Sequence, residues 1–443
     1  MPRARGGALR AALVVLSAVC VAAQGAAMLG GPLPGPFPLF PSTNWWNLDI
    51  SAAPLDPASA SYITYIGTAR ALHPDFGGDV SPGSVQTYGM PYVSVDSTVP
   101  LRAVQFQYAD ESDGVDHATN QSFPFYPIPD DAITQAHWVE GGEPGNVDLR
   151  DSADRHLLIV DRDRRRLFEL YNVFSDGTAW HAGSGAYFDL DANARRPDGW
   201  TSADAAGLAI LPGLVRYDEV FGPDEIGHAF RVTVRSTNGY VYPASHRAGS
   251  AAGALPMGAR LRLTASRDIS GFPPEAQKIF RAMKRYGLIV ADNGSDMYIT
   301  GTYDTRWNNG VLNPAFGALH ASDFEVVQLG YRPALPPTPF TDATLTAGLT
   351  PIRVVHITEL RTRIDAVRAH VGLPPFAWTD PRLDAGLTIV RAQHLVDLRA
   401  ALSQAYTVAG RAAPSYSDPV IAAGTTARAS HIAELRAAVV ALE

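Results

Sequence analysis

Cysteine is almost absent from this sequence, which has a single cysteine, Cys20, among 443 residues. Outside that position, disulfide bonds and thiol chemistry are excluded. A bacterial lipid-attachment site needs a small residue directly before its cysteine, and Val19 stands there instead, so we expect no lipid anchor. The folded protein must therefore be held together by its hydrophobic core or by bound ions.

Long hydrophobic runs are also scarce. The clearest one, Ala11–Ala23, has thirteen residues and follows Arg3, Arg5 and Arg10. Such a run is too short to span a bilayer as a helix, and behind positive charges it is typical of a secretory signal peptide. We therefore expect residues 1–27 to be a signal peptide and the protein to be secreted from a bacterial cell. The alternative is a membrane anchor.

Positive charge is in the minority, with 36 Lys and Arg against 44 Asp and Glu and a net charge of −8. Loss of the signal peptide with its three arginines would make the chain still more acidic. Nucleic-acid binding needs basic surfaces that displace counterions from phosphates, so no nucleic-acid partner is expected.

Several motifs that would indicate a reaction are missing. The sequence has no phosphate-binding loop, dinucleotide fingerprint, HExxH helix, zinc-type cysteine cluster or Gly-x-Ser-x-Gly turn. Nucleotide-dependent enzymes and the common zinc and serine hydrolases are therefore disfavoured. We expect no required cofactor, with a bound calcium ion as an alternative.

The residues that are present describe a globular chain, with 46% hydrophobic and 18% charged residues. Short apolar runs alternate with Gly, Pro, Asp and Asn, as in antiparallel strands joined by turns. One helix is predicted over residues 273–286, opened by two prolines and closed by Gly287. The pattern predicts a mainly β protein, with a β-sandwich or jelly-roll-like domain carrying one or two packed helices.

The predicted organisation continues after the signal peptide. We expect a Pro/Gly-rich lead-in over 28–43, the β-rich and presumed catalytic domain over 44–332, a stiff Pro-rich linker over 333–340 and a helical module over 341–443.

The helical module is predicted from an internal repeat of about 38 residues. Each copy begins at an aspartate and later carries a histidine at the start of a helical stretch; the histidines are His356, His394 and His431. A single helix of this kind cannot bury its apolar stripe alone, so we expect the three to pack together. The repeated histidine indicates either a metal ligand or, as we favour, a packing or capping residue.

The segment 156–219 is rich in Gly, Asp and Trp without a helical period, and we expect it to hold the functional site. Glu169 lies on a mostly apolar strand face, where a carboxyl group would have the raised pKa of a general acid. Its partner carboxylate is expected among Asp204, Asp218 and Glu219. The alternative is that these groups form ion pairs, turns and helix caps.

Aromatic and polar residues nearby suit sugar binding, because indole rings stack on pyranose C–H faces while polar groups bind hydroxyls. The candidate substrate-binding residues are Trp180, His181, Trp200, His228, His246 and Asp292. Two of them, His228 and His246, could instead ligate a metal together with a carboxylate.

An acidic loop contains Asp110, Glu111 and Asp113 at a spacing that suits Ca²⁺. An exported protein without disulfides could use such an ion for stability. The alternative is a solvated acidic loop that binds no ion.

The first domain resembles a group of exported bacterial proteins of mostly unassigned function that have a β-rich domain similar to those of carbohydrate-active enzymes. The resemblance covers most of residues 44–330 and rests on the segments LHPDFGG, YADESDG, WTSADAAGL, LPGLVRYDE, IGHAFRVTV and YGLIVADNG. The C-terminal repeats resemble modules appended to exported proteins of soil bacteria. The resemblance implies a polysaccharide or oligosaccharide as partner and assigns no catalytic residue.

These observations predict an exported carbohydrate-active enzyme, most plainly a glycoside hydrolase that uses paired carboxylates. A polysaccharide lyase, a non-catalytic carbohydrate-binding or cell-surface protein, and a histidine-dependent metalloenzyme stay open as alternatives. The repeats are expected to attach the protein to a cell surface or to another protein.

Overall fold

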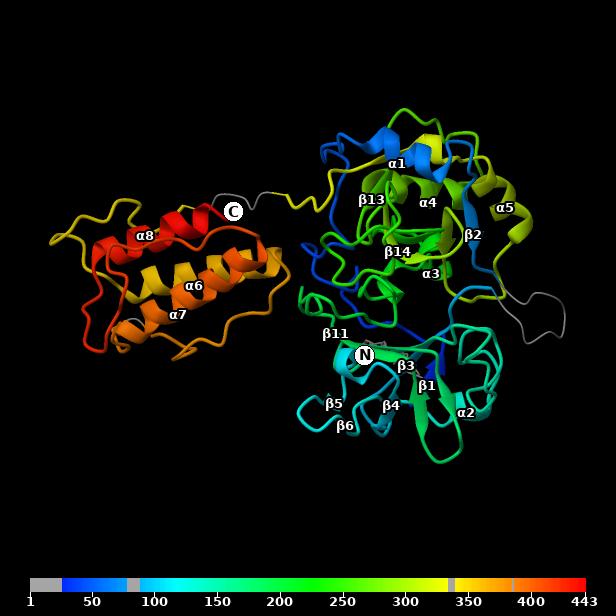
Figure 1. Cartoon of the computed structure of the whole chain (residues 1–443), viewed down its shortest axis with the longest axis horizontal. Helices are drawn as coiled ribbons and strands as arrows, with labels where there is room; N and C mark the ends of the chain where they lie inside the picture. Colours follow the sequence, from blue (N-terminus) through cyan, green and yellow to red (C-terminus); the bar gives the residue numbers. More distant parts are fainter. Residues whose placement is uncertain (1–25, 78–87, 334–338, 385) are drawn as a thin grey trace, which may run out of the picture.

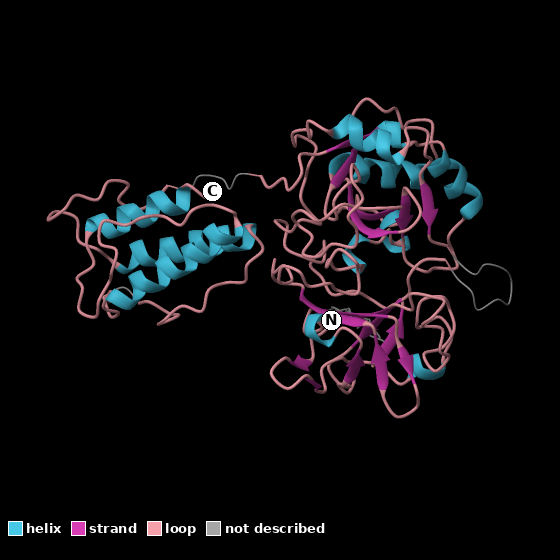
Figure 2. Ribbon diagram, in the orientation of Figure 1, coloured by secondary structure: helices cyan, strands magenta, loops and turns pink. Residues whose placement is uncertain are grey.

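The computed structural model describes residues 26–77, 88–333, 339–384 and 386–443 (Figure 1). Nearly all of the predicted signal peptide and most of the predicted linker therefore lie outside the described residues. Figure 2 shows separate groups of strands, one of them accompanied by several helices, and a further group made of helices alone.

The first group of strands is built on a five-stranded sheet with the order β1-β3-β7-β8-β11. β3 and β7 run parallel, and the other neighbours run antiparallel. All five residues of β7 are buried, and the four before Asp161 are apolar without alternation. The bounds are β1 Ala27–Leu29, β3 Tyr92–Val95, β7 Leu157–Asp161, β8 Arg166–Tyr171 and β11 Ser184–Asp189.

Small elements accompany this sheet. A three-stranded sheet has the order β4-β10-β9, and β5 pairs with β6. The bounds are β4 Val104–Phe106, η1 Ala109–Glu111, β5 Val115–Asp116, β6 Gln121–Ser122, α2 Asp131–Thr134, β9 Phe174–Ser175 and β10 Trp180–Ala182.

The second group is built on a six-stranded sheet with the order β16-β13-β14-β12-β15-β2. Its central strands β12 and β14 run parallel, and helices pack around it (Figure 1). The strands are β2 His73–Asp75, β12 Phe230–Val234, β13 Arg260–Leu263, β14 Leu288–Asn293, β15 Tyr298–Thr300 and β16 Phe324–Val326. The helical elements are α1 Ser59–Ile66, η2 Leu211–Gly213, α3 Tyr217–Val220, α4 Pro274–Arg285, α5 Asn309–Gly317 and η3 Ala321–Asp323.

The prediction of a mainly β, jelly-roll-like fold is wrong. Helices account for 23% of the structure and strands for 18%, and the sheets are mixed. Parallel pairs, such as β3 with β7 and β2 with β15, require crossover connections that an antiparallel jelly roll lacks. The predicted helix is present as α4, which buries Ile279, Phe280 and Met283. Short apolar runs located strands but could not indicate how those strands pair.

The three repeats form three helices, α6 Val354–His370, α7 Ala392–Val408 and α8 Ala429–Val440, and each packs against the other two. Their shared core contains Ile357, Leu360, Leu395, Leu398, Ile432 and Leu435. It is separate from the apolar clusters around the two large sheets. Each helix thus buries its apolar stripe against the other repeats.

The repeated histidines are fully buried at the helix starts. In the first repeat, the backbone N–H of Arg353 donates to Nδ1 of His356, and Nε2 of His356 donates to Asp342 at 3.0 Å. The other two repeats have the same pair of bonds. The geometry is that of a helix cap rather than a metal ligand, because both ring nitrogens are used.

An arginine in each helix links one repeat to the next. Arg361 donates to the carbonyl of Asp380, and Arg399 donates to the carbonyl of Asp418. Arg436, in the third repeat, donates to the carbonyls of Asp342 and Thr341 in the first. The three repeats are therefore closed into a ring.

Among the described residues, no helix combines the length and apolar character needed to cross a bilayer.

Candidate functional site

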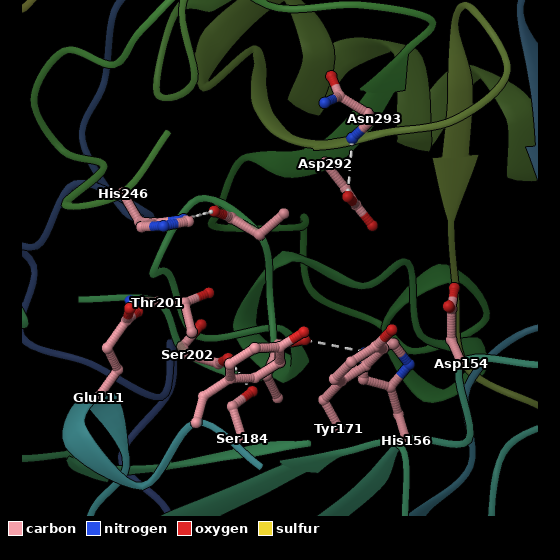
Figure 3. Close-up of a pocket in the computed structure, with 13 residues that line it drawn as sticks. Glu111, Asp154, His156, Tyr171, Ser184, Thr201, Ser202, His246, Asp292 and Asn293 are labelled. Atoms are coloured by element: carbon pink, nitrogen blue, oxygen red, sulfur yellow. Dashed lines mark hydrogen bonds between the residues drawn. The ribbon is translucent and has the colours of Figure 1, made fainter. Parts of the chain in front are cut away.

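A cavity of about 410 Å³ lies between the two large sheets (Figure 3). Tyr171 at the end of β8 and Ser184 at the start of β11 reach it from the five-stranded sheet. Asp292 and Asn293 reach it from the end of β14 in the six-stranded sheet. The remaining lining residues are Tyr108, Glu111, Asp154, His156, Thr201, Ser202, Ala203, Ala205 and His246. We call this cavity the cleft.

Asp292 lies at the edge of the cleft, with its side chain about 30% exposed. Its Oδ1 accepts a hydrogen bond from the Asn293 N–H, and its Oδ2 lies 3.7 Å from Nη2 of Arg231. Burial and the nearby charge of Asp204 raise the pKa of Asp292 to about 6, although Arg231 opposes them. A carboxyl group with this pKa can release or accept a proton near neutral pH.

Asp154 reaches the cleft from the segment just before β7, and its side chain has no hydrogen-bonding partner within the described parts of the chain. The effect of Asp154 on the pKa of Tyr171 indicates that the two side chains lie near each other. Burial raises the pKa of Tyr171, and the negative charges of Asp154 and Asp292 raise it further. Two carboxylates, one from the segment before β7 and one from the end of β14, are therefore close enough to affect one tyrosine hydroxyl.

His156 is buried beneath the cleft in a fixed protonation state. Its Nδ1 lies 2.6 Å from Oε2 of Glu140, and its Nε2 lies 2.9 Å from the carbonyl oxygen of Ala203. Both partners are acceptors, so both ring nitrogens carry hydrogen. Burial alone would lower the pKa of His156, but Glu140 raises it to about 9. His156 is a structural cation that holds the segment around Ala203 against β7.

His246 has one free nitrogen. Its Nδ1 donates to the carbonyl of Ala205 at 2.9 Å, which leaves the lone pair of Nε2 available as an acceptor. Figure 3 shows this ring across the cleft from Tyr171. Of the predicted substrate-binding residues, His246 and Asp292 are the two that line the cleft.

The predicted catalytic carboxylates do not share this cleft. Glu169 is fully buried, and its oxygens accept hydrogen bonds of 2.8–3.0 Å from the N–H groups of Ile210 and Leu211. Burial raises its pKa to about 7. Asp204 is buried as well and pairs with Arg231 at 2.8 Å. Glu169 holds the segment around Ile210 and Leu211, and Asp204 holds Arg231. Because both carboxylates are buried, neither is accessible to a substrate.

Asp218 and Glu219 lie at a second cavity of about 390 Å³. Glu219 contacts Nε2 of His228 at 2.9 Å and Arg216 at 2.8 Å. His228 is thereby committed to Glu219 and to the carbonyl of Ala229. His228 and His246 do not converge, and no group of three potential ligands for a metal occurs in the described part of the chain.

The remaining predicted sugar-binding residues lie elsewhere. Trp180 is buried in the core of the first group of strands, and His181 bonds Asp176 at 2.9 Å. Trp200 packs against Arg196 and His117. None of the three lines the cleft.

The acidic loop is largely engaged by protein groups. Asp113 pairs with Arg196 at 2.5 Å and accepts the N–H of Tyr187. Glu111 accepts the N–H of Thr201 at 2.8 Å and lines the cleft, whereas Asp110 is exposed. A calcium ion in this loop stays a prediction. The carboxylates of Asp113 and Glu111, which would bind the ion, already contact Arg196 and backbone N–H groups.

Sequence reasoning missed Tyr108, Asp154, Tyr171 and Ser184 as site residues. Tyr171 shares a strand face with Glu169, but it stands at the end of β8 and so reaches the cleft, while Glu169 lies two residues inside. The position of Tyr171 at the end of a strand was the feature of the sequence that could have indicated a site residue.

Comparison of the chain with family models, curated proteins and solved structures returned no match.

Proposed function

We propose that the protein is a carbohydrate-active hydrolase that cleaves a glycosidic bond in the cleft, with Asp292 as general acid and Asp154 as its partner carboxylate. The observation that carries the proposal is the placement of these two side chains in one cavity, Asp154 from the segment before β7 and Asp292 from the end of β14, where the charge of each raises the pKa of Tyr171. Glycoside hydrolysis needs two carboxyl groups on either side of the scissile bond.

The two groups differ in the way this chemistry requires. Asp292 is mostly buried, has a raised pKa and is therefore suited to hold a proton and give it to the leaving oxygen. Asp154 is exposed, without a protein partner among the described residues, and is suited to act as a carboxylate on water or on the sugar carbon. One water is consumed, and its proton restores Asp292 by way of Asp154 or solvent.

The test is a screen of the purified protein against a panel of polysaccharides, with release of reducing ends as the readout. Asp292→Asn is expected to lower kcat by about 10²–10⁴, the usual contribution of a general acid. The matched control is Asp151→Asn, which removes a carboxylate that is exposed and does not line the cleft. Full activity in Asp292→Asn on a substrate that the wild type cleaves would refute the assignment.

A polysaccharide lyase is the second candidate, because His246 presents a free ring nitrogen to the cleft as a base would. A lyase acts on a uronate, whose carboxylate must be neutralised, and none of the described cleft-lining residues is lysine or arginine. Its products absorb in the ultraviolet, so absorbance during turnover separates the two reactions. Glycan binding without any product would instead favour a non-catalytic binding protein.

We further propose that the protein is secreted and that the closed helical ring attaches it to a cell surface or to a partner protein. The support is the apolar segment near the N-terminus and the separate core of the ring. Removal of residues 341–443 is expected to leave cleavage intact and to abolish attachment to cells.

A further inference from the structure

The serine and threonine hydroxyl groups of the cleft already donate their protons to carbonyl groups of the protein. Ser184 donates to the carbonyl of Ser202 at 2.7 Å, and Ser202 donates to the carbonyl of Leu208 at 2.6 Å. Thr201 donates to the carbonyl of Asp204 at 3.2 Å. A hydroxyl has one proton and two lone pairs, so these three side chains can only accept hydrogen bonds from a ligand.

Other groups of the cleft are acceptors too. His246 presents the lone pair of Nε2, because Nδ1 donates to Ala205. Glu111 uses Oε2 to accept the N–H of Thr201, which leaves Oε1 as an acceptor. Both side chains are thus fixed to the segment 201–205, and Figure 3 shows them at one side of the cleft. Asp154 and Asp292 add acceptors at the other side (Figure 3).

Negative charge exceeds positive charge in the described lining of the cleft, which has three carboxylates, one histidine cation, His156, and no lysine or arginine. Glu111, Asp154 and Asp292 face it, and the nearby cation Arg231 lies 3.7 Å from Asp292. Arg231 is buried and bonded to Asp204 and Thr300, and His156 is bonded through both nitrogens. An anionic ligand would meet three carboxylates, of which Glu111 and Asp154 have no ion-pair partner among the described residues, at a desolvation cost.

We propose that the cleft selects a glycan that carries free amino groups, with one ammonium group held by Glu111 and His246. An ammonium group brings three donors and a positive charge, which match a carboxylate oxygen, an imidazole lone pair and hydroxyl lone pairs. The inference rests on the proposed function, because it names the class of sugar for the same cleft. It excludes uronate and sulfated glycans as substrates.

The test is titration calorimetry at pH 7 with four oligosaccharides of equal length, made of glucosamine, N-acetylglucosamine, glucose or galacturonic acid. The glucosamine oligomer is expected to bind about tenfold more tightly than the N-acetylated one, as a charge-assisted contact predicts. Added salt is expected to weaken its binding, and the galacturonic acid oligomer is expected not to bind. Equal or tighter binding of the N-acetylated or galacturonic acid oligomer would overturn the proposal.

Variants locate the ammonium site. Glu111→Gln keeps an oxygen for the Thr201 N–H but removes the charge, so it should abolish most of the preference for glucosamine while leaving glucose-oligomer binding unchanged. Asp151→Asn, the exposed control, should keep the preference. Should Glu111→Gln fail to fold, His246→Ala replaces it, since it removes the imidazole acceptor of the same ammonium site and should reduce the preference in the same direction.

Binding and turnover separate this inference from the proposed function. Preferred binding of glucosamine oligomers without cleavage would leave the inference standing and refute the hydrolase. Cleavage of neutral glycans with no preference for the amine would support the hydrolase and refute the inference about amino groups.

Discussion

Glu169 makes a quantitative prediction about stability. Its pKa is raised from 4.5 to about 7 by complete burial in the folded protein. The folded state therefore holds a proton more tightly than the unfolded state, so this group favours folding at low pH and the contribution is lost as pH rises from about 4.5 through about 7. A shift of this size corresponds to about 3 kcal/mol, since one pKa unit equals about 1.4 kcal/mol.

Glu169→Gln removes the titration while keeping an oxygen that can accept from the N–H groups of Ile210 and Leu211. Relative to the wild type, the free energy of unfolding of the variant should rise by about 2–3 kcal/mol between pH 5 and pH 8. Urea unfolding followed by tryptophan fluorescence at several pH values measures this difference. A difference that stays flat with pH would refute the reasoning. Loss of turnover in a variant that stays folded would instead support a catalytic role for Glu169.

Three further predictions concern the cleft and the ring. Activity should fall as pH rises through about 6, where Asp292 loses its proton, and a pH profile of kcat measures this; a profile still rising above pH 7 would contradict the role of Asp292. Arg436→Ala should open the ring and destabilise it by about 1–3 kcal/mol through two orphaned carbonyls, measured by thermal unfolding against Arg382→Ala, an exposed control. Gly207→Ala should disrupt the cleft-forming segment, because φ is +73° and a Cβ would meet the Ser245 Oγ at 2.0 Å; unchanged thermal stability would contradict this.

Local patterns of the sequence predicted elements well where the signal was periodic. The helix α4 and the packed helices of the repeats follow from apolar spacing and from the Pro and Gly residues at their ends. The pairing of strands did not follow, because β7 has four successive apolar residues and such a run can pack against many neighbours. The mixed sheets are decided by contacts between segments far apart in the chain.

The candidate site was predicted in part. His246 and Asp292 line the cleft as the sequence suggested, whereas Glu169 and Asp204 turned inward. A carboxylate on an apolar strand face is equally suited to accept backbone N–H groups, as Glu169 does. Whether such a carboxylate faces a substrate or binds backbone N–H groups depends on the loop packed over it. The loop that covers Glu169 has no periodic pattern in the sequence.

The closed ring of helices sets the number of repeats. Arg436 binds the backbone of the first repeat in the way that Arg361 binds the second, so every repeat has two neighbours and none is terminal. An open solenoid can lengthen by one unit, but a fourth copy here would have to break an existing link before forming its own. Gain or loss of a repeat should therefore be an all-or-none event for this module, whereas cutting and rejoining it at a different loop should preserve the fold.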